Sequence, residues 1–549
     1  MQEEWMDALR NFVIFAYIFT LVPYSLASSA ARVADQGVIA AEVQFQAFRL
    51  RHYDFSGVQY GSSSSKVAFD AVSLGKDIVR KAVIVNWMDL VGKDIEKLLS
   101  APAGAILVII PKDVASLNAQ QKKAFLAVEK QLESFKTDQA VYIVPDSEEI
   151  QYVLGQLTQT TEKAISATRQ LYNLIFSNNY VLSSSLSNNP APITPKQFNV
   201  IASLNAKEKA PTLAFVAHYD SSSIAPGLST SSDSNGSGVA ALLELFTVFK
   251  KFYSDENSPK YNLLFAFTAG GKYNYQGSRQ FIDSLSDKEN IRLVTCLDSL
   301  GAGEDLYMQV SKIPNDDAIA RKVFDRISNN MPKNRKIKMA HKKINLGNEW
   351  LAWEHELYNI RKKPAMTLTH FPEHDSPLRN SLLDTIDTVN IDALYANTKA
   401  IANGVLSYIY DLDETLCADA FAEHVECSFA TGEIVNKERI VAFLDAIASR
   451  PRHIENSESF ANYIKEILER YEVKASLQPV KFVDAIIYGN LEDTIFAHST
   501  KAPIFEFFIG AFVALYLYLF YLFSVNAEKI FTFIAFPSSK KILADEDLD

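Results

Sequence analysis

The stretch TLAFVAHYD, at residues 212–220, decides the fold, because an uninterrupted apolar run ends there in polar side chains. Similar apolar runs recur along the chain, at FNVIASL 198–204, YNLLFAF 261–267, IRLVTCL 291–297 and AMTLT 365–369. Amphipathic segments such as GVAALLELFTVFKKF, at 238–252, separate these runs. Such alternation is typical of a mainly parallel sheet covered by helices. We therefore predict an α/β domain over 166–410, with a mainly parallel mixed sheet flanked by helices.

A smaller α/β domain is predicted before this one, over residues 32–165. Its strand-like runs AVIVN (82–86), AGAILVIIP (103–111) and AVYIVP (140–145) alternate with polar helical stretches. Residues 411–502 are mixed and mostly polar, and we expect them to form a membrane-proximal region that connects the body to the C-terminal end.

Both ends of the chain contain a stretch of 21 residues without a charge, at 11–31 and 507–527. The first breaks at Pro23 and passes into small residues, so we interpret 1–31 as a signal peptide, with an uncleaved anchor as the alternative. The second is apolar on all faces and predicts a transmembrane helix over 503–527. A type I protein follows, with a lumenal body, one span of the lipid bilayer and a cytosolic tail at 528–549.

Charge and cysteine content narrow the function further. The net charge of −11 and the pI near 5.5 argue against a nucleic-acid partner. The three cysteines are too few for a disulfide scaffold. In an oxidising lumen Cys417 and Cys427 could pair, whereas Cys296 lies in an apolar run and is expected to be a buried thiol.

Polar residues at predicted strand ends form a candidate site, because ligands of open α/β sheets bind at the carboxyl ends of strands. His218 ends one strand, Asp233 lies in the Gly-containing turn SDSNGSGV, and Asp298 follows the strand IRLVTCL. Histidine and aspartate are common metal ligands, although a single such residue at a strand end is more often part of a structural hydrogen bond.

The order of these elements resembles the di-zinc aminopeptidase clan over roughly residues 197–390. By that resemblance His218, Asp233 and Asp298 match a zinc-binding His, the bridging Asp and a later zinc-binding Asp. Other positions depart from the clan. Gly271 and Lys272 stand where the clan has its general-base Glu and a zinc-binding Glu, and Asn380 stands where it has its last His.

These departures predict a protein without catalytic residues, metal or cofactor, because a hydrolytic zinc needs several protein ligands and a base for its water. We hypothesise that Lys272 replaces one metal ion and pairs with Asp233. The alternative is an exposed loop lysine. A weak aminopeptidase with one zinc, held by the three remaining ligands, is the second candidate function.

Two competing motifs are weaker. Residues 411–415, DLDET, match the signature of aspartyl-phosphate phosphatases, which would make Asp411 a nucleophile. That motif must end a strand, but the residues before it repeat at helical spacing. His370, His374 and Asp375 could form a local metal cluster, although surface histidines in a Pro-containing loop are the favoured interpretation.

Longer stretches resemble the nicalin family, relatives of nicastrin within the same clan. They are VAHYD 216–220, SDSNGSGV 232–239, YNLLFAF 261–267, GGKYNYQGS 270–278 and HKKINLGNEWLAWEHE 341–356. The resemblance implies an endoplasmic reticulum protein without peptidase activity, which acts with a Nodal-modulator-type lumenal protein and a small multi-spanning membrane protein. It further implies association with the translocon and its multi-pass clients, and links to Nodal signalling and receptor assembly.

Overall fold

The computed structural model describes residues 42–159, 178–186, 189–206, 210–253, 259–285, 289–411, 434–501 and 503–527. These residues form two compact units. The larger unit comprises residues 45–148 and 183–495, and the smaller one comprises the described parts of 1–44, 149–182 and 496–549. Strands β1 (Glu42–Arg49), β8 (Asn178–Ser184) and β19 (Glu492–Lys501) each have residues in both units. The signal-peptide prediction, Cys417 and Cys427 lie outside the described residues.

The N-terminal part of the larger unit contains the smaller α/β fold that the sequence predicts. Its strands follow the order β4 (Ala68–Ser73), β5 (Ala82–Asn86), β6 (Ala105–Ile110), β7 (Lys136–Pro145), β3 (Val58–Ser64), β2 (His52–Phe55), β18 (Ala485–Tyr488) and β9 (Pro192–Ile193). The pairs from β4 to β3 are parallel, and the remaining pairs are antiparallel. Helices α2 (Trp87–Leu90), α3 (Ile95–Ser100) and α4 (Ala119–Glu133) pack against this sheet through Trp87, Ile95 and Phe125.

A second sheet forms the predicted mainly parallel domain. Its strand order is β15 (Ile337–His341), β14 (Leu306–Val310), β16 (Ala365–Thr369), β13 (Ile291–Leu297), β11 (Thr212–His218), β12 (Asn262–Thr268), β10 (Gln197–Leu204) and β17 (Ser476–Val480). Strands β16, β13, β11 and β12 are parallel neighbours, so their carboxyl ends meet at one edge. The predicted fold class is confirmed.

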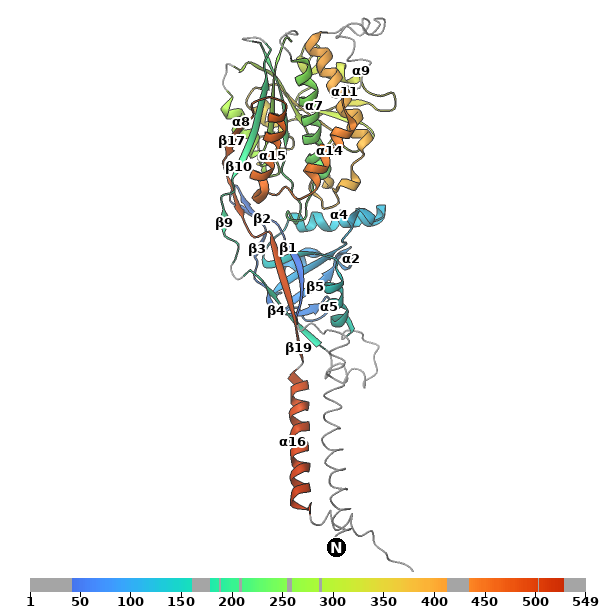
Figure 1. The fold of residues 1–549 in the computed structure, drawn as a ribbon, viewed down its shortest axis with the longest axis vertical. Helices are drawn as coiled ribbons and strands as arrows, with labels where there is room; N and C mark the ends of the chain where they lie inside the picture. Colours follow the sequence, from blue (N-terminus) through green and yellow to red (C-terminus); the bar gives the residue numbers. More distant parts are fainter. Residues whose placement is uncertain are drawn as a thin grey trace, which may run out of the picture. The chain divides into compact units, whose positions relative to one another are not determined.

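Helices cover both faces of this sheet (Figure 1). Alternate residues of β11 divide between two cores, with Phe215 in one and Val216 in the other, as the twofold period of a strand requires. The first core is completed by α7 (Gly238–Phe252), α9 (Ile319–Asn329), α11 (Ile391–Tyr410), α14 (Lys437–Ala448) and α15 (Ser457–Arg470). The second contains α8 (Gln276–Ser284) and α10 (Glu354–Ile360).

Residues 434–480 contribute directly to the larger core, although they fall in the range 411–502 that the sequence predicts as a connecting region. Phe443 and Leu444 of α14 and Ile464 of α15 are buried in it. Strand β17 pairs with β10 at the edge of the eight-stranded sheet. Where the domain limits lie therefore stays a prediction, but this segment is part of the folded body.

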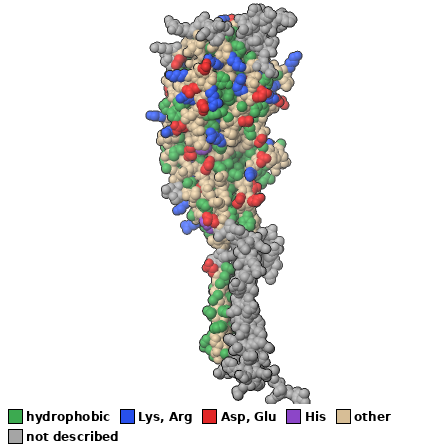
Figure 2. Space-filling model, in the orientation of Figure 1, with side chains coloured by type: hydrophobic (Ala, Val, Ile, Leu, Met, Phe, Trp, Pro, Cys, Tyr) green, Lys and Arg blue, Asp and Glu red, His purple; other side chains and the backbone are tan. Residues whose placement is uncertain are grey.

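The smaller unit includes α5 (Glu148–Gln159, most of it) and the apolar helix α16 (Pro503–Val525). Within α16, residues Phe505–Val525 have a mean hydropathy of 2.1 and none of them is buried. Figure 2 shows mainly hydrophobic side chains along its visible face. By length and composition this helix can cross a membrane, and it coincides with the predicted span at 503–527.

Candidate functional site

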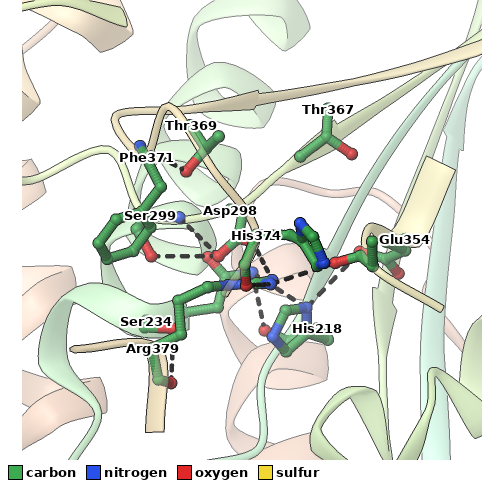
Figure 3. Close-up of polar contacts among 12 residues, drawn as sticks. His218, Ser234, Asp298, Ser299, Glu354, Thr367, Thr369, Phe371, His374 and Arg379 are labelled. Carbon is green, nitrogen blue, oxygen red and sulfur yellow. Dashed lines mark hydrogen bonds and ion pairs between the residues drawn. The ribbon is translucent and has the colours of Figure 1, made fainter. Parts of the chain in front are cut away.

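The predicted site residues come together at the carboxyl edge of the parallel strands. His218 is the last residue of β11, Asp298 follows β13, and Gly271 and Lys272 lie just beyond the end of β12. Asp233 reaches the same edge from the turn before α7, and is buried with an exposed fraction of 6%. Figure 3 shows His218 and Asp298 on neighbouring strands, with the side chain of Arg379 extending toward both.

Asp233 has all its carboxylate contacts within the protein. Its Oδ1 accepts hydrogen bonds from Ser237 Oγ at 2.7 Å and from the backbone N–H of Gly301 at 2.7 Å. Its Oδ2 lies 2.6 Å from Nε2 of His370. His370 follows β16 and is only 9% exposed. The interpretation of His370 as a surface histidine is therefore wrong, because the strand end directs it into the site.

Asp298 pairs with an arginine that the sequence analysis did not single out. Arg379 Nη2 donates to Asp298 Oδ2 at 2.6 Å, and the guanidinium stacks over Trp353 with 4.5 Å to the ring centroid. Burial would raise the pKa of Asp298, but the charge of Arg379 holds it well below its usual range. This aspartate is therefore an ionised, charge-paired carboxylate at neutral pH.

His218 faces a second acidic residue that was not predicted. Its Nδ1 lies 3.5 Å from Oε2 of Glu354, the first residue of α10. Glu354 also accepts a hydrogen bond from Ser278. Both members of the pair have side chains that are only 3% exposed. The imidazole is thus fixed in orientation by protein contacts.

Lys272 points into the site, but its partners differ from the prediction. Nζ donates to Ser234 Oγ at 2.9 Å, to the backbone carbonyl of Arg379 at 2.5 Å and to Asn380 Oδ1 at 3.3 Å. The hypothesis that it pairs with Asp233 is wrong, because His370 and two hydrogen-bond donors already surround that carboxylate. An exposed loop lysine is also excluded.

The charge of Lys272 is nevertheless balanced locally. Burial lowers its pKa to about 8, and the nearby guanidinium of Arg379 acts in the same direction. The carboxylates of Asp298, Asp384 and Asp220 oppose that shift. The site therefore contains two protein cations, Lys272 and Arg379, among its acidic residues.

Backbone amides neutralise the remaining carboxylates. Asp220 accepts hydrogen bonds from the N–H groups of Gly271 at 2.7 Å and Lys272 at 2.8 Å. Asp384 accepts hydrogen bonds from the N–H groups of Asp233 at 2.7 Å and Ser234 at 2.8 Å. Burial raises the pKa of Asp384 to about 7, and the neighbouring charge of Asp233 adds to the shift.

Gly271 leaves no room for a side chain at its position. An added Cβ would lie 2.2 Å from Cγ of His218 and 2.4 Å from its Cβ. Neither atom is the end of a flexible side chain, so a larger residue requires the strand end to shift.

The donor set does not fit the two zinc ions that the resemblance to zinc aminopeptidases implies. Each of the three ligand-type residues has a protein partner, namely Glu354 for His218, His370 for Asp233 and Arg379 for Asp298. Two cations, Lys272 and Arg379, lie among them and would repel a divalent ion. Within the described ranges, no group of three or more His, Cys, Asp or Glu residues is arranged to hold a metal.

A small cavity of about 230 Å³ opens beside these groups. Its lining includes His218, Lys272, Arg379 and Asn380 together with Tyr275 and Trp350. Asn380 links the two parts of the larger unit, since its Nδ2 donates to Glu133 Oε1 of α4 at 3.4 Å. The loop that carries the cations is thus held in place from two sides.

The competing motifs do not form sites in the described residues. Asp411 follows helix α11, not a strand, and its exposed carboxylate pairs with Lys260 at 3.1 Å. The rest of the phosphatase-like motif, from residue 412 on, lies outside the described residues. His374 and Asp375 are exposed, as expected for a surface loop.

Sequence reasoning could have found His370 but had little chance with Arg379. His370 follows the apolar run AMTLT, so the strand-end rule that selected His218 applies to it equally. Arg379 lies in an irregular loop 81 residues from Asp298, where no periodicity places its side chain. Glu354 begins a short helix, and its burial depends on the packing of that helix against the sheet.

Comparison with known proteins agrees with this geometry. The Peptidase family M28 profile matches residues 199–403, which contain most of the site. The γ-secretase component nicastrin has a similar structure, with a TM-score of 0.56 and 10% sequence identity over 83% of this chain and 99% of that chain. At this low identity the likeness shows the fold alone.

Full-length relatives are more informative. Nicalin of Caenorhabditis elegans is 33% identical over 96% of this chain and 97% of its own length. The BOS complex subunit ncln of Danio rerio is 30% identical over 97% of this chain and 98% of its own length. With this identity sustained from end to end, the chain belongs to the nicalin family.

Proposed function

We propose that this chain is a non-catalytic subunit of an endoplasmic reticulum membrane complex, anchored by α16 with its body in the lumen. The observation that carries the proposal is the pairing of every ligand-type residue with another protein side chain, with Lys272 and Arg379 placed among the acidic groups. Such a site stabilises a fold and has no free base or open metal position for hydrolysis.

Family resemblance supports the residue roles in this proposal. Gly271 and Lys272 stand where active aminopeptidases of the clan have glutamates, and Asn380 stands where they have a histidine. The surroundings of Gly271 are consistent with a lost glutamate, because a Cβ there would overlap His218. A single zinc held by His218, Asp233 and Asp298 would have to displace the existing partners of all three side chains.

Membership of a complex is supported by the relatives named as BOS complex subunits. By resemblance, the partners would be a Nodal-modulator-type lumenal protein and a small multi-spanning membrane protein, acting with the translocon on multi-pass clients. Effects on Nodal-type signalling or on receptor subunit assembly would follow from the clients and not from cleavage by this chain.

Affinity purification of the tagged full chain from membranes in a mild detergent tests the assembly role. We expect both partner types in amounts comparable with the chain. A chain that is recovered alone, under conditions that preserve other membrane complexes, would contradict the role.

Aminopeptidase assays on the same preparation test the absence of catalysis. We expect no turnover of amino-acyl coumarin substrates, with or without added zinc. Turnover that disappears in a His218→Ala variant would refute a non-catalytic subunit, whatever the partners are.

A further inference from the structure

The eight-stranded sheet ends at a strand with a high concentration of positive charge. Within the described residues, β15 pairs with β14 and leaves its other edge open. The segment KNRKIKMAHKK, at 333–343, contains six Lys or Arg residues and no acidic residue, in a chain whose net charge is −11. This edge contains none of the residues that line the cavity, so its role is independent of the proposed function.

The hydrogen-bond register shows which backbone groups face outward. The backbone N–H of Leu306 donates to the carbonyl of Lys336 at 2.9 Å, and that of Lys342 donates to the carbonyl of Val310 at 3.0 Å. In a parallel ladder the even-numbered residues of β15 therefore bond to β14. The N–H and C=O groups of Ile337, Met339 and His341 point away from the sheet and can pair with another strand.

Side chains on the two faces of β15 differ in character. Ile337 is buried and Met339 packs against the main core, so this face is apolar next to the open edge. On the opposite face Lys336 and Lys338 are exposed two residues apart. Lys338 forms an ion pair with Asp305, so its charge is partly balanced.

The other lysines have no such partner. Lys333, Lys336 and Lys343 are exposed and form no ion pair with any residue in the described part of the chain. A lysine-rich edge can serve only to prevent edge-to-edge aggregation. It can also attract a strand of opposite charge, because cross-strand pairs of opposite charge are stabilising.

We propose that β15 is the docking edge for an extended segment of a partner protein in which acidic residues alternate with apolar residues. Such a segment would add a strand through the outward backbone groups of Ile337, Met339 and His341. Its acidic side chains would lie beside Lys336 and Lys338, and its apolar side chains would cover the face of Met339. A second copy of this chain fits less well, because its own β15 carries the same charge.

A synthetic peptide of alternating valine and glutamate, labelled with fluorescein, tests this edge on the purified full chain in detergent. We expect saturable binding by fluorescence anisotropy that weakens as salt is raised. Hydrogen exchange at the amides of Ile337, Met339 and His341 should slow when the peptide binds. The triple variant Lys333→Glu, Lys336→Glu and Lys343→Glu should lose affinity by about tenfold or more.

Matched controls separate strand addition from simple charge attraction. Charge reversal of Lys66, Lys93 and Lys97, which are exposed elsewhere, should change affinity by less than about twofold. The same peptide with alternate backbone amides methylated keeps its charge but cannot complete the ladder, and should bind about tenfold more weakly. Equal binding of the methylated peptide, or no binding of either peptide, would overturn the proposal.

Discussion

Replacement of Arg379 by methionine tests most sharply whether protein cations hold the site together. Its guanidinium donates to Asp298 at 2.6 Å, to Tyr275 Oη at 3.3 Å and to the carbonyl oxygens of Ala352 and His374 at 3.1 Å each. Methionine retains much of the apolar volume over Trp353 but removes the charge and these donors.

The expected loss follows from what the substitution leaves behind. Asp298 is only 4% exposed, so its carboxylate would stay buried without its main partner. Removing one member of a buried ion pair costs about 3–5 kcal/mol. We expect about 3 kcal/mol, the lower end, because Lys272 still contributes positive charge near Asp298.

Urea denaturation of the full chain in detergent, followed by tryptophan fluorescence at pH 7, measures this loss. The double variant Arg379→Met, Asp298→Asn should recover about 1–2 kcal/mol, because no unpaired charge is left. Arg321→Met breaks an exposed pair with Asp325, 3.3 Å apart, and should cost less than about 0.5 kcal/mol. A loss below about 1 kcal/mol for Arg379→Met, or strict additivity in the double variant, would refute the reasoning.

Three further predictions use the same denaturation assay. Burial raises the pKa of Glu129 to about 8, so the folded protein holds a proton that the unfolded chain releases, and this contribution is lost as pH rises from about 5 to 8. Glu129→Gln should therefore flatten the fall in stability over that range by up to about 1.4 kcal/mol per pH unit, and an unchanged slope would contradict this. Gly271→Ala should cost about 1–3 kcal/mol because the new Cβ would lie 2.2 Å from Cγ of His218, and a neutral effect would show that the pocket is not closely packed. Arg439→Met should cost about 3–5 kcal/mol because it leaves the fully buried carboxylate of Glu244 without its charged partner, and a cost under about 1 kcal/mol would separate residues 434–480 from the core energetically.

The sequence predicted the sheet well, because apolar runs such as IRLVTCL carry both their burial and their direction in the chain. The same reasoning brought His218, Asp233 and Asp298 to one edge. It underestimated the segment after residue 433, where Phe443, Leu444 and the helical period around them mark a buried face. Polar composition concealed that face, since the outward residues of an amphipathic helix dominate its average.

The partners of the site residues were harder to predict than the residues themselves. Lys272 was expected to balance Asp233, but its side chain instead meets acceptors of the loop that contains Arg379 and Asn380. That loop is positioned by tertiary contacts with α4, including the hydrogen bond from the backbone N–H of Leu382 to Glu129 Oε1 at 2.9 Å. No local pattern encodes a contact between segments more than two hundred residues apart.

Zinc content of the purified full chain, measured by mass spectrometry after equilibration with zinc and removal of the excess, tests the central claim most directly. If Lys272 and Arg379 supply the positive charge that metals provide in a zinc aminopeptidase, the chain retains far less than one zinc ion per molecule. Two tightly held zinc ions per molecule, both lost in His218→Ala and Asp298→Asn variants that remain folded, would contradict that claim.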